Sequence, residues 1–352
     1  KILSFKPLVS IGLISYSLYL WHFPIISFTK YTFFQELNLI QAVIIFIVSV
    51  IISYISWRFF ERKFRDKKII DRRFIFKFAA LGSVFLISIG LLGHFNNGFD
   101  ERLSKQEQEI LRIKNLDQFN QQLRTGVCFL EEEDLIRSFD SSCFSEEILL
   151  WGDSHAAALF HGLNEIQPIS QLTSSGCPPI LDISLSDNND CAFLNDQIFS
   201  SIKENKYKLI ILHANWIRHG YGDYFKSFKD TLQQIFAIQE DIKIIVVGNT
   251  PQWFNSLPKY LVFNAISIQD IKKNSGFIQT HLEKQVVSDE LIKDSIDEID
   301  NENIQFISIL DEYCLNSACL GMNPEGNNEL LFWDYGHLTE KGSSTYARHI
   351  FK

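Results

Sequence analysis

Charged residues are scarce in the first hundred positions of the chain. Stretches of 23, 21 and 22 residues without Asp, Glu, Lys or Arg lie between Lys6 and Lys30, Glu36 and Arg58, and Lys77 and Asp100. A hydrocarbon core of roughly 30 Å needs about 20 apolar residues in helical form, because unpaired backbone polar groups are costly in lipid. We therefore predict three transmembrane helices within residues 1–95. Three buried helices of a soluble domain are the alternative, whereas a signal peptide has one short apolar core and is excluded.

Basic residues are in the minority after residue 100. The first hundred residues hold 12 Lys and Arg against 5 Asp and Glu, whereas the remainder holds 21 against 37. A face that binds nucleic acid needs a surplus of positive charge to neutralise phosphates, so we expect no nucleic-acid partner. A chain of 352 residues also exceeds one small module and indicates more than one domain.

The positive charge of the first hundred residues is concentrated in one loop. Nine Lys and Arg against three acidic residues lie from Arg58 to Lys77, while the other connecting loop offers only Lys30 and Glu36. Lys and Arg are retained on the cytoplasmic side of a membrane. We therefore expect the basic loop in the cytoplasm and everything after Asn96 on the other side of the membrane.

Cysteine is missing before residue 128, and no Cys-x-x-Cys pair or His-x-x-x-His pair occurs to suggest a zinc site. All six cysteines lie in the part of the chain assigned to the outside, where disulfides persist. Six cysteines allow fifteen pairings. We predict the pairs nearest in sequence, with zinc as the alternative: Cys128–Cys143, Cys177–Cys191 and Cys314–Cys319.

From residue 146 onward, short apolar runs alternate with stretches long enough for helices, such as Tyr224–Gln239. The runs are Ile148–Trp151, Leu209–Leu212, Ile242–Val247 and Ile304–Ile309. This alternation predicts a mostly parallel sheet with helices on both faces, and ligands of such sheets bind beyond the carboxyl ends of the strands. The polar residues 96–145 are expected to form a linker leading into this domain, with a helix near Lys105–Leu123.

Polar motifs lie where a ligand of this sheet would bind. Gly152-Asp153-Ser154-His155 follows the first run, Asn215 follows the second, and Asp334 and His337 precede a last helical stretch. A serine hydroxyl becomes a nucleophile when a base takes its proton, and imidazole suits that task. We expect Ser154 as nucleophile, His337 as base and Asp334 as the carboxylate that fixes the imidazole tautomer. The Ser154 N–H and the Asn215 amide would bind the oxyanion.

Each of these residues also has an ordinary structural explanation, because Ser154 and Asp334 suit helix caps and His337 could be a surface or a core histidine. The joint occurrence of the motifs favours a catalytic site. Asp153 is expected to organise the turn. The nearby histidines are expected to be structural: His155, His161 and His213. Aromatic side chains that could stack on sugars, but more often belong to the core, are Trp216, Tyr221, Tyr224, Trp253 and Trp333.

The polar motifs resemble the first, third and fifth sequence blocks of the SGNH hydrolases, over residues 146–352. The resemblance implies a flavodoxin-like three-layer α/β fold with Ser154, Asp334 and His337 as the catalytic triad. It also implies an oxyanion hole formed by the Ser154 N–H, Asn215 and a second-block glycine, for which Gly176 is the best match. The third block departs from the family pattern at its first and last residues, His213 and Trp216.

The apolar segment resembles the end of the membrane domain of acyltransferase family 3. Tyr16–Pro24 (YSLYLWHFP) is similar to a late transmembrane motif of that family, and Ser56–Arg62 (SWRFFER) to the end of its domain. Family members have many more spans, so we expect this chain to be the C-terminal part of a longer protein. His22 is expected to be a polar group at a helix interface, rather than the essential histidine near the family's first helices.

An acyltransferase family 3 domain joined to an outer SGNH domain implies O-acetylation of a bacterial envelope glycan: lipopolysaccharide O-antigen, peptidoglycan or another polysaccharide. The resemblance implies cytoplasmic acetyl-CoA as acyl donor, an acyl-Ser154 intermediate, and no metal or bound cofactor. It places the chain in the inner (plasma) membrane, in contact with lipid, with its C-terminal domain in the periplasm or outside the cell. It leaves the oligomeric state open.

Two alternatives to the transferase stay open. In an O-acetyl esterase, water would accept the acyl group instead of a sugar. In a non-catalytic glycan-binding domain, the chemistry would belong to the membrane acyltransferase. The triad residues do not distinguish between water and sugar as acceptor.

Overall fold

The computed structural model describes residues 6–33, 38–65, 71–112, 116–131, 138–144, 146–183, 191–205, 207–219, 224–254, 256–323 and 329–351. The chain forms two compact units, Lys1–Gln108 and Glu109–Lys352.

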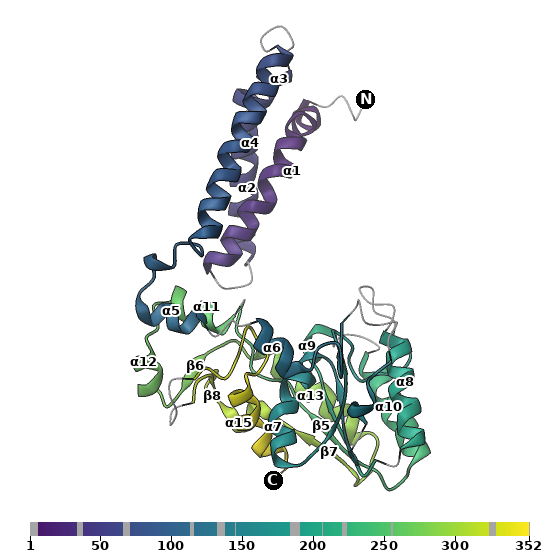
Figure 1. Ribbon diagram of the computed structural model, residues 1–352. Helices are drawn as coiled ribbons and strands as arrows, with labels where there is room; N and C mark the ends of the chain where they lie inside the picture. Colours follow the sequence, from purple (N-terminus) through teal and green to yellow (C-terminus); the bar gives the residue numbers. More distant parts are fainter. Residues whose placement is uncertain are drawn as a thin grey trace. The chain divides into compact units, whose positions relative to one another are not determined.

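The first unit is built from long apolar helices (Figure 1). They are α1 (Lys6–Phe33), α2 (Leu39–Ser56), which continues through the π-helical turn η1 (Trp57–Glu61) into α3 (Arg62–Arg65), and α4 (Arg72–Phe95). Within the described residues, three segments are long and apolar enough to cross a membrane: Val9–Lys30, Leu39–Arg65 and Arg72–Phe95. The prediction of three apolar helices of spanning length is confirmed.

Several polar groups in this unit find partners inside it. Asn38 caps the start of α2, and Asp71 caps the start of α4. Ser17 donates a hydrogen bond to Glu61 at 2.8 Å. The Nδ1 atom of His22 lies 3.0 Å and 2.9 Å from two carbonyl oxygens of its own helix, so this atom must carry the proton and donate.

The second unit contains a parallel sheet whose strands, among the described residues, follow the order β1-β3-β2-β4-β5-β7. They are β1 (Phe129–Leu130), β2 (Ile148–Gly152), β3 (Ser170–Ser174), β4 (Leu209–His213), β5 (Lys243–Val247) and β7 (Ile304–Ile307). Without β1, the spatial order in chain numbering is 2-1-3-4-5, which is the flavodoxin-like order. The predicted fold class is therefore confirmed.

Helices cover both faces of this sheet (Figure 1). One core cluster packs the sheet against α8 (Cys191–Glu204), α10 (Tyr224–Ile238) and α13 (Glu283–Asp297). The other packs it against α7 (Ser154–Ile166), α11 (Leu257–Phe263) and α15 (Glu340–Ile350). Strand β4 shows why both faces are filled: Ile210 and Leu212 point into the first cluster and Ile211 into the second.

Smaller elements complete the second unit. A short antiparallel sheet has the order β6-β9-β8, from β6 (Phe277–Gln279), β9 (Ala318–Leu320) and β8 (Cys314–Leu315). The remaining short helices of this unit are α6 (Leu116–Leu123), η4 (Ser141–Cys143), α9 (Trp216–His219), α12 (Ile268–Lys273) and α14 (Ile309–Tyr313). Helix η2 (Asp100–Arg102) lies in the first unit, and α5 (Lys105–Arg112) runs across the boundary after Gln108.

The expected linker over residues 96–145 needs correction, because much of it belongs to the sheet domain. Strand β1 pairs with β3, and Leu123 and Leu130 are buried in the two core clusters. The helix expected near Lys105–Leu123 is two helices, α5 and α6. Strand β3 was not predicted, and the expected strand over Ile304–Ile309 ends at Ile307, since Ile309 begins α14.

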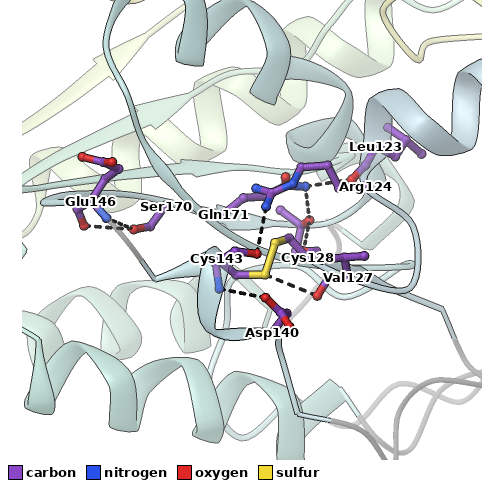
Figure 2. Close-up of a disulfide and its surroundings, with 11 residues drawn as sticks. Leu123, Arg124, Val127, Cys128, Asp140, Cys143, Glu146, Ser170 and Gln171 are labelled. Carbon is purple, nitrogen blue, oxygen red and sulfur yellow. Dashed lines mark hydrogen bonds between the residues drawn. A yellow bond between two sulfur atoms is a disulfide. The ribbon is translucent and has the colours of Figure 1, made fainter.

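The three predicted disulfides are confirmed. Cys128–Cys143 ties the residues before β1 to η4 (Figure 2). Cys177–Cys191 joins the turn after β3 to the start of α8, and Cys314–Cys319 links two strands of the small sheet. No free cysteine remains to support the zinc alternative; all six lie in the part of the chain that the structure describes.

Candidate active site

The junction of β2 and α7 places Ser154 at the carboxyl edge of the sheet. Gly152 has no room for a side chain, because a Cβ atom there would lie 1.7 Å from the carbonyl oxygen of His213 on β4. Asp153 then caps α7 and accepts a hydrogen bond from the His155 N–H at 2.8 Å. Ser154 is therefore the first residue of α7, and the positive end of the helix dipole at that turn favours a developing negative charge.

Asp153 also ties β2 to the next strand. Its second carboxylate oxygen accepts a hydrogen bond from the Asn215 N–H at 2.9 Å, just after β4. Burial raises the pKa of Asp153 to about 6, although the hydrogen bonds from Asn215 and His155 counteract part of the shift. The side chain thus organises the turn, as expected from the sequence, and fixes Asn215 beside the Ser154 turn.

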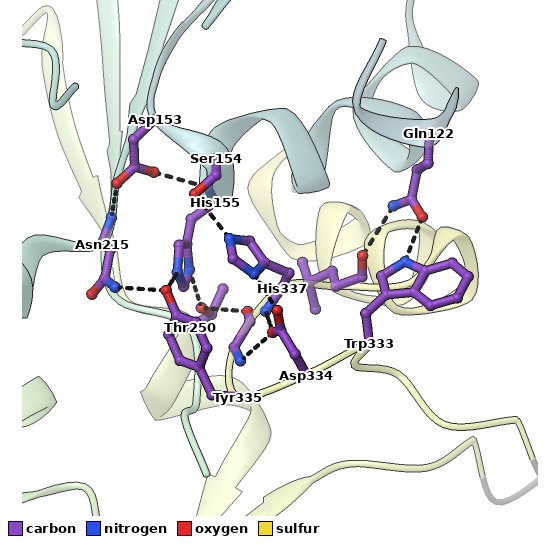
Figure 3. A network of polar contacts seen from close by, with 12 residues as sticks. Gln122, Asp153, Ser154, His155, Asn215, Thr250, Trp333, Asp334, Tyr335 and His337 are labelled. Carbon is purple, nitrogen blue, oxygen red and sulfur yellow. Dashed lines mark hydrogen bonds and ion pairs between the residues drawn. The ribbon is translucent and has the colours of Figure 1, made fainter. Parts of the chain in front are cut away.

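Ser154, His337 and Asp334 form a continuous hydrogen-bonded line (Figure 3). The Ser154 Oγ atom lies 2.8 Å from Nε2 of His337, and Nδ1 of His337 lies 2.8 Å from Oδ2 of Asp334. The other oxygen of Asp334 accepts the N–H groups of Gly336 and His337, both at 3.0 Å. The structure therefore brings together all three residues that the sequence proposed as the triad.

The electrostatics of Asp334 suit a carboxylate that stays ionised beside an imidazole. Burial on its own would raise the pKa of Asp334. The hydrogen bonds and positive charge of His337, with the N–H of Gly336, outweigh burial, and the net pKa lies below its ordinary value. With an ionised carboxylate at Nδ1, the proton of neutral His337 is held there, so Nε2 is free to accept the Ser154 proton.

The other two residues predicted for the oxyanion hole, Asn215 and Gly176, lie in different surroundings from each other. Asn215 lies at the carboxyl end of β4, and its amide group enters a network beside the triad, donating to the Tyr335 hydroxyl at 3.2 Å. Gly176 lies in the turn after β3, with φ +64°, and a Cβ atom there would be 3.6 Å from Nη1 of Arg218. The described contacts do not link Gly176 to Ser154, so its role stays a prediction.

Several residues beside the triad were missed by the sequence analysis. His155, expected to be structural, has its ring centroid 4.6 Å from that of His337 and lies 3.1 Å from the Tyr335 hydroxyl. Phe119 of α6 packs edge-on against His337. Gln122 of α6 accepts a hydrogen bond from the Trp333 indole at 2.8 Å. Two of these residues lie within motifs that could have drawn attention to them: His155 ends the Gly-Asp-Ser-His motif, and Tyr335 lies inside the Asp-x-x-His motif.

The other two histidines expected to be structural have no contact with the triad among the described residues. His213 is completely buried, and Nδ1 lies 3.2 Å from the Val247 carbonyl oxygen. Burial lowers the pKa of His213 to about 4, so its ring stays neutral. Nε2 of His161 lies 3.4 Å from Oε1 of Glu165, one helical turn away.

The aromatic residues considered for sugar stacking belong to the core where the structure describes them. Buried members of that group are Trp216, Tyr224, Trp253 and Trp333. Tyr221 lies outside the described residues. Their burial leaves no ring face of these four side chains for a sugar. Among the described residues, no group of three or more His, Cys, Asp or Glu is arranged to hold a metal ion.

Comparison with known proteins agrees with this geometry. The family described as SGNH domain (fused to AT3 domains) matches residues 117–352. The match begins upstream of residue 146, in agreement with the inclusion of α6 and β1 in the sheet domain.

Two curated relatives are similar over a short part of the chain. The O-acetyltransferase OatA of Staphylococcus aureus is 43% identical over 68 residues, 19% of this chain and 11% of that protein. The peptidoglycan O-acetyltransferase OatA of Listeria monocytogenes is 40% identical over 72 residues, 20% of this chain and 12% of that protein. The chain thus matches only a small fraction of the length of these relatives.

A solved structure shares the fold. The periplasmic domain of a lipopolysaccharide acetyltransferase from Salmonella ser. Paratyphi A has a TM-score of 0.56 at 22% identity, covering 70% of this chain and 98% of that one. With the match over residues 117–352, the chain belongs to the family of SGNH domains that are fused to acyltransferase family 3 (AT3) domains.

Proposed function

We propose that this protein transfers an acetyl group to a hydroxyl of a cell-envelope glycan through an acetyl-Ser154 intermediate. The observation that carries the proposal is the line from Ser154 through His337 to Asp334, with both hydrogen bonds at 2.8 Å. The OatA relatives are named as O-acetyltransferases, one of them of peptidoglycan, and the solved neighbour as a lipopolysaccharide acetyltransferase. These names support a glycan acceptor.

In the first half-reaction, the Ser154 oxygen attacks the carbonyl carbon of an acetyl donor while Nε2 of His337 takes the hydroxyl proton. Asp334 stabilises the imidazolium that forms. The Ser154 N–H and the Asn215 amide are the donors proposed for the oxyanion. Collapse of the tetrahedral intermediate breaks the bond to the leaving group, which receives the proton from His337, and leaves acetyl-Ser154.

In the second half-reaction, a glycan hydroxyl gives its proton to His337 and attacks the acetyl carbon. The bond to the Ser154 oxygen breaks, and that oxygen recovers the proton from His337. If water takes the place of the glycan, the same steps hydrolyse the acetyl enzyme. Transfer and hydrolysis therefore differ only in the acceptor, so the experiment must determine whether glycan or water accepts the acetyl group.

The setting we propose is an inner (plasma) membrane with the SGNH domain in the periplasm or outside the cell. The basic segment from Arg58 to Lys77 supports this orientation, and disulfides suit an oxidising compartment. The acetyl donor that begins the route is cytoplasmic acetyl-CoA, acting as a substrate. The apolar helices contact membrane lipid.

The experiment compares the full chain in detergent with its Ser154→Ala variant, using 4-nitrophenyl acetate as a donor that reaches Ser154 directly. We expect wild type to release nitrophenol faster when glycan fragments are added and to acetylate them, and Ser154→Ala to do neither. Acceptors are peptidoglycan fragments and O-antigen oligosaccharide, each analysed by mass spectrometry. Ser295→Ala, in which a half-buried serine of α13 outside the site is lost, is the matched control.

Each outcome has one interpretation. If the rate of nitrophenol release does not change when glycan is added and the only acetyl product is free acetate, the protein is an esterase and the proposed transfer is wrong. Equal activity in Ser154→Ala and wild type overturns the serine mechanism. A serine-directed phosphonate that fails to label Ser154 in wild type supports a non-catalytic domain instead.

A further inference from the structure

Tyr335 lies between Asp334 and His337 in the chain. Its hydroxyl group points away from these two residues, toward Asn215 and His155. The oxygen is 3.2 Å from Nδ2 of Asn215 and 3.1 Å from Nε2 of His155 (Figure 3). The Tyr335 ring packs edge-on against the ring of His337, with centroids 5.3 Å apart. One side chain thus contacts both the base and the amide proposed for the oxyanion hole.

The direction of the hydrogen bonds around Tyr335 follows from Thr250, at the far end of the same network. Thr250 has a single hydroxyl proton, which it donates to the carbonyl oxygen of Gly336 at 3.3 Å. Thr250 must therefore accept the proton on Nδ1 of His155, at 3.1 Å. Neutral His155 then has only a lone pair on Nε2, so the Tyr335 hydroxyl donates to it. The Tyr335 oxygen accepts from the Asn215 amide.

The other contacts of Asn215 fix the rest of its amide group. Its Oδ1 atom accepts a hydrogen bond from Nε2 of Gln252 at 3.0 Å, and its backbone N–H donates to Asp153. Rotating the amide by 180° would turn its NH₂ group toward the Gln252 donor, so the observed orientation is favoured. An amide has two N–H donors. Tyr335 takes one of them, which leaves the other for a ligand.

We propose that Tyr335 is a positioning residue, which holds the Asn215 amide so that its second N–H is presented to the oxyanion formed at Ser154. The inference rests on the proposed acyl transfer. Tyr335 follows Asp334 directly and lies two residues before His337, so one turn sets the place of both the base and the oxyanion donor. Burial keeps the hydroxyl protonated, since it raises the pKa of Tyr335.

The test is Tyr335→Phe in the full chain, which keeps the ring and removes the hydroxyl. Loss of an oxyanion donor costs about 10²–10³ in kcat elsewhere, and a donor that is present but unrestrained retains part of that effect. We expect kcat for 4-nitrophenyl acetate to fall about tenfold with KM unchanged. The matched control is Tyr313→Phe, which removes a partly buried hydrogen bond to the Thr345 carbonyl oxygen outside the site and should leave kcat at the wild-type value.

A double-mutant cycle with Asn215→Ala separates positioning from general loss of structure. If Tyr335 acts through the amide, Tyr335→Phe changes kcat by less than about twofold when Asn215 is already alanine. An undiminished effect in that background means that Tyr335 acts through His155 or through the fold, and overturns the inference. So does a Tyr335→Phe variant with wild-type kcat.

Phosphonate labelling keeps this test independent of the proposed function. The phosphonyl oxygen occupies the place of the oxyanion, so the labelling rate of Ser154 should also fall about tenfold in Tyr335→Phe. No labelling of wild type contradicts the proposed serine chemistry itself. Equal labelling of wild type and Tyr335→Phe contradicts only the positioning role.

Discussion

The Ser154 Oγ atom and the His337 Nε2 atom lie 2.8 Å apart, although the two residues are 183 positions apart in the chain. The contact between α7 and α15 sets this distance. Ser343 of α15 donates to the Leu159 carbonyl oxygen of α7 at 2.8 Å and accepts from the Gly162 N–H at 2.7 Å. A Cβ atom at Gly162 would be 2.2 Å from the Ser343 carbonyl oxygen, so only glycine permits this approach.

Replacement of Asp334 by Asn tests whether the carboxylate sets the tautomer of His337. The Oδ1 atom of an asparagine still accepts the N–H groups of Gly336 and His337, so the turn is kept. Its NH₂ group would donate to Nδ1 and place the imidazole proton on Nε2, where it cannot accept from Ser154. We expect kcat for acetyl release to fall about 10²–10⁴-fold with an unchanged unfolding midpoint.

The matched control for this change is Asp297→Asn at the exposed end of α13, which should keep wild-type kcat. An Asp334→Asn enzyme within about twofold of wild-type kcat would show that the imidazole is oriented by other groups.

Gln122 on α6 is expected to support the loop that carries Asp334 and His337. Its amide accepts from the Trp333 indole at 2.8 Å and donates to the Leu338 carbonyl oxygen at 3.0 Å. Gln122→Met keeps the size of the side chain and leaves both groups unpaired. We expect the free energy of unfolding to fall by about 1–3 kcal/mol and kcat by about tenfold. Chemical denaturation and acetyl release measure the two effects.

Gln121→Met is the control, because Gln121 is exposed on the same helix. Equal effects of the two substitutions on kcat would mean that α6 has no specific hold on the catalytic loop.

The strands that bury apolar side chains could be predicted from the sequence. Strand β3, which buries mostly polar side chains, was missed. Strand β3 reads Ser-Gln-Leu-Thr-Ser, and its polar side chains donate hydrogen bonds to the segment that precedes β2. Gln171 donates to the Leu123 carbonyl oxygen at 3.0 Å, and Thr173 donates to that of Cys128 at 3.0 Å. Hydrophobic periodicity cannot detect a strand held this way, and for the same reason residues 116–144 looked like a linker.

The triad could be predicted because its chemistry demands a hydroxyl, an imidazole and a carboxylate, which occur in short motifs. The network around Tyr335 could not, because each of its members has an ordinary role as a single residue. Gln252 and Thr250 follow β5, while His155 is the second residue of α7. Their relation to Asn215 exists only after the sheet aligns the ends of β2, β4 and β5.

The orientation of the membrane helices is open to a labelling experiment, since the six native cysteines are paired. We expect a cysteine introduced as Asn97→Cys, after α4, to react in intact cells with a maleimide that does not cross the inner membrane. A Lys68→Cys variant, in the basic segment, should react only after the membrane is disrupted, because Lys and Arg are retained inside. The reverse pattern would place the SGNH domain in the cytoplasm.

Asp289 is expected to make the protein less stable as pH rises. It lies buried on α13, and its Oδ1 atom accepts from the N–H of Asn249, just after β5, at 2.8 Å and from the Asn249 side-chain amide at 2.7 Å. Burial raises the pKa of Asp289 to about 7 from 3.8, and nearby Asp311 adds to the shift. The folded state therefore binds this proton more tightly than the unfolded state. Its contribution to stability is complete below pH 3.8 and is lost as pH rises through 7.

Asp289→Asn removes this titration while its carbonyl oxygen still accepts from Asn249. We expect a variant that matches wild type at pH 4 and exceeds its free energy of unfolding at pH 8 by roughly 2–4 kcal/mol, in urea denaturation followed by circular dichroism. Some loss of stability with rising pH should persist, because burial also raises the pKa of Asp153, to about 6. Asp297→Asn serves as the exposed control. A variant whose stability falls as steeply as that of wild type between pH 4 and 8 would show that Asp289 is ionised throughout this range.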